Sequence, residues 1–195
     1  MRDLGGMPLR GGGVTRSGAI WRSGHPDRVD AAGWAELRAM GVSTVVDLRN
    51  ASERTAAGNM LDGVRVVHVP IEDVAHPDYF GRWNGDWATP DFFAWGRGIW
   101  PALWASAFAA IADAPAGVLM HCAAGRDRTG TMTAALLETV GVEREAILDD
   151  YVRGILESDN RNIDDLVDDY RAALGRLLDG WDPEPELVAA AMKLR

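Results

Sequence analysis

The chain has 195 residues, of which 47% are hydrophobic, and its formal net charge is −9. This length and composition suffice for one substantial core, so we expect a single domain over residues 1–195. The acidity, concentrated from Glu143 onward, argues against a nucleic-acid partner. No apolar run is long enough for a membrane span, and residues 1–13 lack the apolar stretch of a signal peptide. A cytoplasmic protein without an integral membrane segment is expected.

The first part of the chain is predicted to alternate strands with helices. Residues 1–24 are rich in glycine with short β-prone pieces, which predicts either a small hairpin or an edge of the sheet. Apolar residues at helical spacing predict a helix over 30–40, with Asp30 as its N-cap and Gly41 as its C-terminal stop. Buried strands are expected over 43–48 and 64–69.

Polar residues near these strands have structural interpretations as well as functional ones. A short helix is expected over 52–57, and Arg49 and Glu53, four residues apart, are expected to pair along it. A substrate contact by Arg49 is the alternative. His68 is interpreted as a strand residue rather than a general base.

Residues 72–100 form the least regular stretch. Irregular segments of this length are often lids or binding loops, so we hypothesise a mobile aromatic lid over the reactive centre. The alternative is that the rings fill a second small core. The stretch contains Tyr79, Phe80, Trp83, Trp87, Phe92, Phe93, Trp95 and Trp100.

A helix over 101–113, beginning at Pro101, precedes the apolar run 117–120 and a second apolar run from Met132. Strand, tight loop and helix are therefore expected around 121–130. With the earlier strands this predicts an α/β core over residues 1–142, with the loop at the carboxyl end of a strand.

The loop 121–130, HCAAGRDRTG, carries residue types that all suit one reaction. Its backbone N–H groups and the positive helix end form an anion site above Cys122, the only cysteine of the chain. That site and the neighbouring Arg126 favour the thiolate, which can attack phosphorus and leave a phosphocysteine for water to hydrolyse. Arg128 can fold back and offer two parallel donors to phosphate oxygens. The phosphate-binding residues are expected to be Ala123, Ala124, Gly125, Arg126, Thr129 and Gly130.

Beyond Gly141 the pattern predicts helices that pack on the core over 143–195. Asp164, Asp165, Asp168 and Asp169 could suggest a metal site, but their spacing suits no calcium loop and fits a solvated helix face. No metal is expected.

The loop resembles the HCxxGxxR(S/T)G signature of cysteine-dependent protein tyrosine and dual-specificity phosphatases. Patches at 2–6, 21–24 and 45–53 are similar to the bacterial atypical tyrosine phosphatases, which often read HCxxGKDRTG. The resemblance implies a mostly parallel sheet flanked by helices, no cofactor, and phosphorylated protein or lipid as substrate. Arg126 stands where that pattern has lysine, which keeps the charge but changes the hydrogen-bonding geometry.

A phosphatase of this kind needs a general acid, because the leaving group departs faster when protonated. In the resembling group the motif aspartate has that role, which points to Asp127; a purely structural role is the alternative. Asp91 is a rival, since Trp87-Ala88-Thr89-Pro90-Asp91 loosely resembles the Trp-Pro-Asp loop of tyrosine phosphatases. Further rivals are Asp73, Asp78 and Asp86.

The resemblance also implies supporting roles. Thr129 is expected to donate a hydrogen bond to the Cys122 sulfur, and His121 to fix the loop, with simple packing as its alternative. Arg22, Ser23 and His25 either face the loop or act as turn residues.

Two other classes compete with a phosphatase. A module that binds phosphorylated ligands without turnover would not need Cys122, Asp127 and Arg128 together. A sulfurtransferase or arsenate reductase is disfavoured by the complete motif and by the lack of a second thiol. Tyrosine, serine or lipid phosphate esters all remain open as substrates.

Overall fold

The computed structural model describes residues 1–54, 64–81, 89–115, 117–158 and 167–195. Within these residues lies a five-stranded sheet of order β1-β2-β5-β3-β4, in which β1 is antiparallel to β2 and the other pairs are parallel. The strands are β1 (Arg2–Asp3), β2 (Ile20–Ser23), β3 (Thr44–Asp47), β4 (Arg65–His68) and β5 (Val118–His121). The expected mostly parallel sheet with the N-terminal segment at its edge is confirmed.

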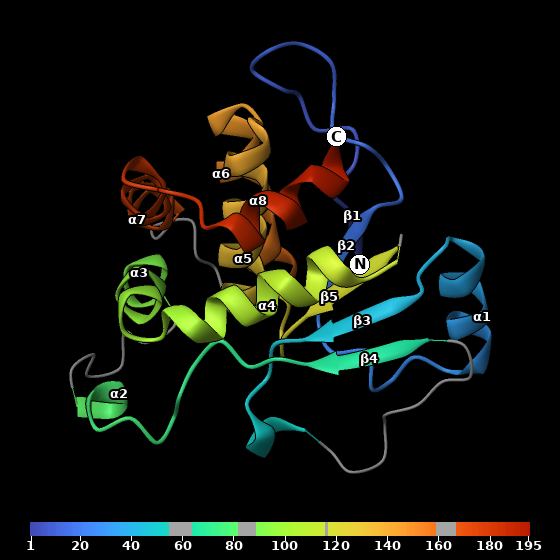
Figure 1. Cartoon of the computed structure of the whole chain (residues 1–195), viewed down its shortest axis with the longest axis horizontal. Helices are drawn as coiled ribbons and strands as arrows, with labels where there is room; N and C mark the ends of the chain where they lie inside the picture. Colours follow the sequence, from blue (N-terminus) through green and yellow to red (C-terminus); the bar gives the residue numbers. More distant parts are fainter. Residues whose placement is uncertain (55–63, 82–88, 116, 159–166) are drawn as a thin grey trace.

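Helices flank this sheet, as expected (Figure 1). They are α1 (Ala31–Ala39), α2 (Asp78–Gly81), α3 (Pro90–Ile99), α4 (Pro101–Asp113), α5 (Asp127–Val140), α6 (Arg144–Ser158), α7 (Val167–Asp179) and α8 (Pro185–Ala191), with 3₁₀ turns η1 (Ala51–Glu53) and η3 (Met192–Leu194). Asp30 caps α1, since its side chain accepts a hydrogen bond from the Gly33 N–H.

The two faces of the sheet pack against different helices because successive strand residues point to opposite sides. Val45 and Leu119 pack with Trp34 of α1 on one face. Val46 and Met120, the next residue along each strand, belong to the larger core on the other face. In Figure 1, α1 lies apart from α4, α5 and α8, which pack together.

The four parallel strands end in one row, because Ser23, His121, Asp47 and His68 are neighbours in register. The segments that follow the strands therefore meet at the carboxyl edge of the sheet, where α/β proteins form their sites. β5 lies between β2 and β3, so the segment after it has neighbours on both sides.

The stretch 72–100 is more regular than the sequence indicated. Residues 90–99 form α3, whose N-cap is Thr89, with Pro90 in the first turn. Tyr79, Phe92, Phe93 and Trp100 are all buried in the main core, and rings such as Phe92 and Phe93 meet edge to face. For these rings the packing alternative is favoured over a lid. Trp83, Asp86 and Trp87 lie outside the described residues.

The C-terminal helices pack on the α/β core. α8 lies against α4 and α5, α6 against α5, and α7 against α3. Asp164 and Asp165 lie outside the described residues, while Asp168 and Asp169 occupy the exposed first turn of α7. Among the helices that the structure describes, none is long and apolar enough to cross a membrane.

Candidate active site

The loop that the sequence singled out follows the central strand directly. Cys122 comes immediately after β5, residues 123–126 form a bend, and α5 begins at Asp127. Arg128 and Thr129 therefore lie in the first helical turn, where N–H groups without helical partners and the helix dipole favour an anion.

The carbonyl groups of the loop are held from outside. His121 Nδ1 lies 3.0 Å from the Cys122 carbonyl oxygen, so this ring nitrogen carries the donated proton. The Ala123 carbonyl accepts from the His25 N–H at 2.9 Å. The C=O and N–H of a planar trans peptide point in opposite directions. Holding these carbonyls outward therefore turns the N–H groups of Ala123 and Ala124 to the inner side of the loop.

The third held carbonyl is that of Gly125, which accepts from Arg22 Nη2 at 2.7 Å. Gly125 has φ 73°, and a Cβ there would lie 2.3 Å from the Ser23 carbonyl oxygen. Only glycine fits this conformation and this close approach. Arg22, Ser23 and His25 thus lie against the loop, which is the first of the two alternatives that the sequence left open.

The sulfur of this loop is buried. Cys122 is 2% exposed and carries a free thiol. Thr129 Oγ1 is also buried, and among the described residues it has no hydrogen-bond partner. Its hydroxyl remains available as a donor at the N-terminal turn of α5.

Arg128 is held by two glutamates that sequence reasoning did not connect with it. Its Nη2 donates to Glu53 Oε1 at 2.6 Å and its Nη1 to Glu53 Oε2. Glu72 Oε2 lies 3.5 Å from Nη1. Burial opposes charge on Arg128, but Glu53 and Glu72 outweigh it, and the pKa of Arg128 is raised. The guanidinium therefore stays charged.

Glu53 accepts from Nη1 and Nη2, the two terminal nitrogens of the Arg128 guanidinium. The edge formed by Nε and its neighbouring Nη is therefore the one that can bind a ligand. Burial by itself would raise the pKa of Glu53, but hydrogen bonds from Arg128 lower it below its ordinary value. Glu72 differs, because burial raises its pKa. The available sequence signal was that both glutamates follow strands, β3 and β4, at the edge where the loop lies.

Asp127 opens α5 and is largely buried. Arg126 Nε lies 3.1 Å from its Oδ1 and 2.9 Å from its Oδ2. Burial raises the pKa of Asp127 despite the opposing effect of Arg126. A carboxyl group that keeps its proton to higher pH suits a general acid.

The rival aspartates have different surroundings. Asp91 lies in the first turn of α3, with a side chain 42% exposed and paired with Arg176 at 2.7 Å. Asp73 and Asp78 are exposed, and Asp73 caps the turn by accepting from the Ala75 N–H. None of these three has a contact with the loop in the interactions described.

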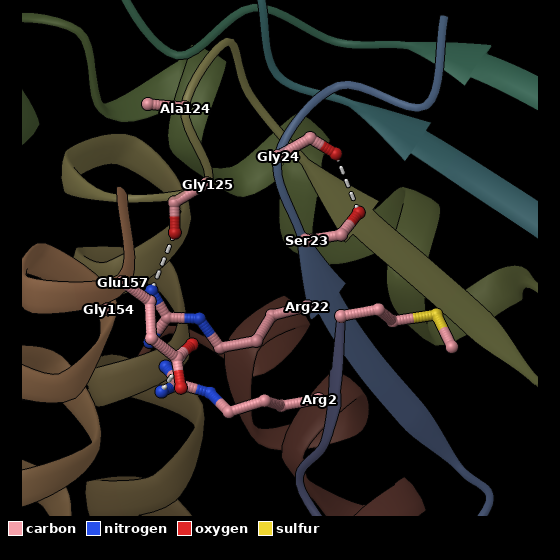
Figure 2. A pocket seen from close by; sticks show the side chains of 9 residues that line it. Arg2, Arg22, Ser23, Gly24, Ala124, Gly125, Gly154 and Glu157 are labelled. Atoms are coloured by element: carbon pink, nitrogen blue, oxygen red, sulfur yellow. Dashed lines mark hydrogen bonds and ion pairs between the residues drawn. The ribbon is translucent and has the colours of Figure 1, made fainter. Parts of the chain in front are cut away.

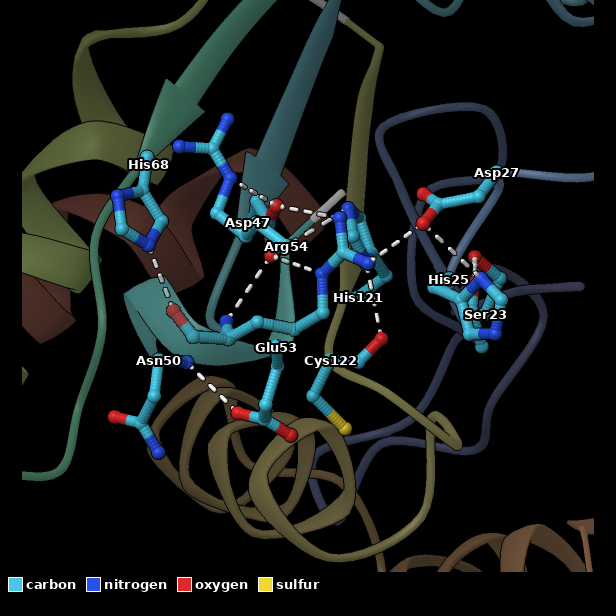
Figure 3. Close-up of polar contacts among 12 residues, drawn as sticks. Ser23, His25, Asp27, Asp47, Asn50, Glu53, Arg54, His68, His121 and Cys122 are labelled. Carbon is cyan, nitrogen blue, oxygen red and sulfur yellow. Dashed lines mark hydrogen bonds and ion pairs between the residues drawn. The ribbon is translucent and has the colours of Figure 1, made fainter. Parts of the chain in front are cut away.

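A buried ionic network lies behind the loop (Figure 3). Arg49 Nε and Nη2 donate to the two carboxylate oxygens of Asp47 at 3.0 and 2.9 Å, and Nη1 donates to Asp27 at 2.9 Å. The expected Arg49–Glu53 pair is therefore wrong. The reason is that residues 51–53 form a 3₁₀ turn rather than an α-helix, so the i, i+4 spacing does not apply.

His68 and His121 both have structural partners here. His68 Nε2 lies 2.7 Å from the Arg49 carbonyl oxygen, in line with the interpretation as a strand residue. Burial lowers the pKa of His121, which favours the neutral ring beside Asp47. Figure 3 shows the side chains of Glu53 and Cys122 extending to the same side of this network.

No cluster of histidine, cysteine and carboxylate side chains able to hold a metal is found within the described ranges.

The comparisons agree with this geometry. The model of the tyrosine phosphatase family matches residues 1–193. The triple specificity protein phosphatase PtpB of Mycobacterium tuberculosis is 32% identical over 209 residues, covering 89% of this chain and 72% of its own length. A putative tyrosine-protein phosphatase of Cupriavidus necator is 32% identical over 176 residues, covering 83% of this chain; the match spans 60% of that relative.

Among solved structures, P. aeruginosa TpbA in complex with pTyr aligns with 24% identity and a TM-score of 0.45, covering 90% of this chain and 87% of that one. The family match over nearly the whole chain and the two bacterial relatives confirm the resemblance to this family. This chain belongs to the tyrosine phosphatase family and is a cysteine-dependent phosphatase of the bacterial atypical group.

Proposed function

We propose that this chain hydrolyses phosphate monoesters with Cys122 as nucleophile. The thiolate attacks phosphorus, the S–P bond forms, and the bond from phosphorus to the leaving oxygen breaks. The inner N–H groups of residues 123–126 and the Nε edge of Arg128 bind the phosphate oxygens, where negative charge must be stabilised in the transition state. Arg126 contributes its backbone N–H to this cradle. The Gly130 N–H, expected there from the sequence, instead donates to the Arg126 carbonyl at 2.7 Å, because Gly130 already lies within α5.

Asp127 is the general acid of the first step. Its protonated carboxyl gives the proton to the departing alkoxide or phenolate, and the raised pKa of Asp127 supports that role. In the second step the carboxylate takes a proton from water as the water oxygen attacks phosphorus. The S–P bond breaks, inorganic phosphate is released, and Thr129 donates a hydrogen bond to the thiolate.

The observation that carries this proposal is the outward anchoring of the three loop carbonyls around a buried cysteine. A loop that turned its carbonyls inward would repel a phosphate. A binding module without turnover is not favoured, because such a module has no need of Cys122, Asp127 and Arg128 together in one loop.

Phosphotyrosine is the substrate class that we favour. Cys122, a residue only 2% exposed, is reached more easily by an aryl phosphate, whose ring carries the phosphate away from a peptide backbone, than by the shorter phosphoserine. Serine and lipid phosphates are secondary candidates, and the name of the M. tuberculosis relative, a triple specificity protein phosphatase, supports testing more than one substrate class.

The proposal includes one domain over residues 1–195 in the cytoplasm. The C-terminal residues Leu174, Leu187 and Leu194 share a core with Val46 and Met120 of the sheet, which supports one folding unit.

The test is phosphate release from para-nitrophenyl phosphate, a phosphotyrosine peptide, a phosphoserine peptide and a soluble phosphoinositide, without added metal. Wild type and Cys122→Ser are compared side by side. We expect turnover that Cys122→Ser abolishes, with the phosphotyrosine peptide preferred. Full activity in Cys122→Ser would refute the mechanism, whereas an inactive wild type that still binds vanadate would indicate a binding module.

A further inference from the structure

Arg22 is a buried charged residue whose position the proposed mechanism leaves unexplained. It lies in β2, its side chain is 2% exposed, and its two terminal nitrogens point in different directions. Nη2 donates to the Gly125 carbonyl at 2.7 Å, and Nη1 donates to Asp150 of α6 at 2.5 Å. Figure 2 shows this side chain reaching from the strand to both the loop and the helix.

Burying a guanidinium is costly unless it is paired. Asp150 supplies the pairing, and it also binds Arg2 of β1, whose Nη2 lies 3.2 Å from Asp150 Oδ1. Arg2 is the direct neighbour of Arg22 across β1 and β2, so the Asp150 carboxylate bridges two adjacent arginines, and Glu157 supplies a second carboxylate 3.2 Å from Arg2 Nη1. The buried charge of Arg22 is therefore held by contacts among β1, β2 and α6.

The surrounding backbone makes room for these guanidinium groups. Gly154, one turn beyond Asp150 on α6, leaves a space in which a Cβ would lie 2.6 Å from Arg22 Nη2. Gly130 of α5 also lies near this guanidinium, since a Cβ at Gly130 would lie 3.4 Å from Arg22 Nη2. A pocket of about 140 Å³, lined by Arg2, Arg22, Gly125 and Gly154, opens on this cluster (Figure 2).

The contact with Gly125 controls one peptide group of the phosphate loop. Arg22 holds the Gly125 carbonyl outward, so the N–H of Arg126, in the same peptide plane, points inward. A cation bonded to the carbonyl also polarises that peptide and strengthens its N–H as a donor. The two other held carbonyls use a neutral imidazole and a backbone N–H, so Arg22 is the charged member of this set.

We propose that Arg22 is a positioning residue that aims the Arg126 N–H at the bound oxyanion, and that Asp150 holds Arg22 in place. Helix α6, in the C-terminal part of the chain, thereby contributes to oxyanion affinity. This inference rests on the proposed function of the loop. Arg22 acts through the Gly125 peptide and does not itself contact the substrate.

The experiment measures the inhibition constant of vanadate for the full chain, with para-nitrophenyl phosphate as substrate. Arg22→Met removes the bonds to Gly125 and Asp150, and it should raise the vanadate inhibition constant by about tenfold or more. The effect should stay below the roughly 100- to 1,000-fold loss that follows removal of an oxyanion donor itself. Arg22→Lys keeps the charge but cannot bridge both partners, so an intermediate constant is expected. Asp150→Asn should also weaken binding, and should add little in the Arg22→Met background.

The matched control is Arg171→Met. Arg171 of α7 also donates to α6, through Asp149 at 2.6 Å, but has no described contact with the loop. Its removal should leave the vanadate constant within about twofold, as expected for a partly exposed ion pair. Circular dichroism and melting curves restrict the comparison to folded variants. If Arg22→Met does not fold, Arg22→Lys and Asp150→Asn decide the question.

Unchanged vanadate affinity in folded Arg22→Met, or in both substitute variants, would overturn the inference. So would an equal loss in Arg171→Met. A wild type that neither turns over para-nitrophenyl phosphate nor binds vanadate directly would instead refute the proposed function, so the two failures are distinguishable.

Discussion

Asp127→Asn should slow the enzyme by an amount that depends on the leaving group. Asparagine keeps the shape of the side chain and a hydrogen-bond acceptor for Arg126, but it has no proton to give. General acid catalysis is typically worth about 100- to 10,000-fold. At 1.36 kcal/mol for each factor of ten, this is about 2.7 to 5.4 kcal/mol of transition-state stabilisation.

The assay compares kcat/KM, which reports only the step that forms the phosphocysteine, for two substrates. The leaving group of phenyl phosphate needs a proton, and that of para-nitrophenyl phosphate needs it much less. We expect the full loss on phenyl phosphate and a clearly smaller loss on para-nitrophenyl phosphate. The raised pKa of Asp127 also predicts the direction of the pH dependence. The wild-type rate falls as pH rises through that pKa, because the acid form disappears, and this alkaline limb should be absent from Asp127→Asn.

Asp91→Asn is the control for this experiment, because Asp91 is exposed and paired with Arg176. It should retain kcat/KM on both substrates within about twofold, since exposed ion pairs contribute little. Equal losses on the two substrates in Asp127→Asn would show that this residue only supports the loop. A selective loss on phenyl phosphate in Asp91→Asn would move the acid role to α3.

Three further results are expected. Arg128→Lys should lower kcat by about 100-fold or more, since an ammonium cannot keep the Glu53 pair and bind two phosphate oxygens; steady-state kinetics showing a loss below about tenfold would contradict this. Asp47→Asn should lower the free energy of unfolding at pH 7 by about 3–5 kcal/mol, because Arg49 loses its buried partner. Burial opposes and Arg49 favours the charged form, and the pKa of Asp47 is lowered; its contribution is therefore present above about pH 4 and lost below it, so urea titrations should converge in acid. Hydrogen exchange of residues 90–100 should not change with vanadate, because these residues are already packed in the core; slower exchange there would restore the lid hypothesis.

The loop, and the sheet with its flanking helices, could be predicted from the sequence because both depend on local residue patterns. The spacing of HCAAGRDRTG defines a turn between a strand and a helix, and the apolar runs on either side predict β5 and α5. Thr89 and Pro90 were an overlooked local signal, since together they cap and begin α3. The glycines and aspartates around them masked a helix whose aromatic face is buried.

The partners of the site arginines could not be predicted in the same way, because they lie far apart along the chain. Glu53 precedes Arg128 by 75 residues, and Asp150 follows Arg22 by 128. These pairs form only when parallel strands bring separate loops to one edge. Where a local rule did apply, to Arg49 and Glu53, it required an α-helix that the 3₁₀ turn does not provide.

The four parallel strands end in register, and this alignment limits where the chain can accept an inserted residue. One added residue within β5 would move Cys122 by about 3.3 Å along the strand and turn the following side chains to the opposite face. The same addition at Gly12 or Gly13, glycines with positive φ and open space around them, would leave that alignment intact. Length variation among relatives should therefore accumulate in the N-terminal turn and stay out of β5, so that β5 sets a fixed length between Gly117 and the nucleophile.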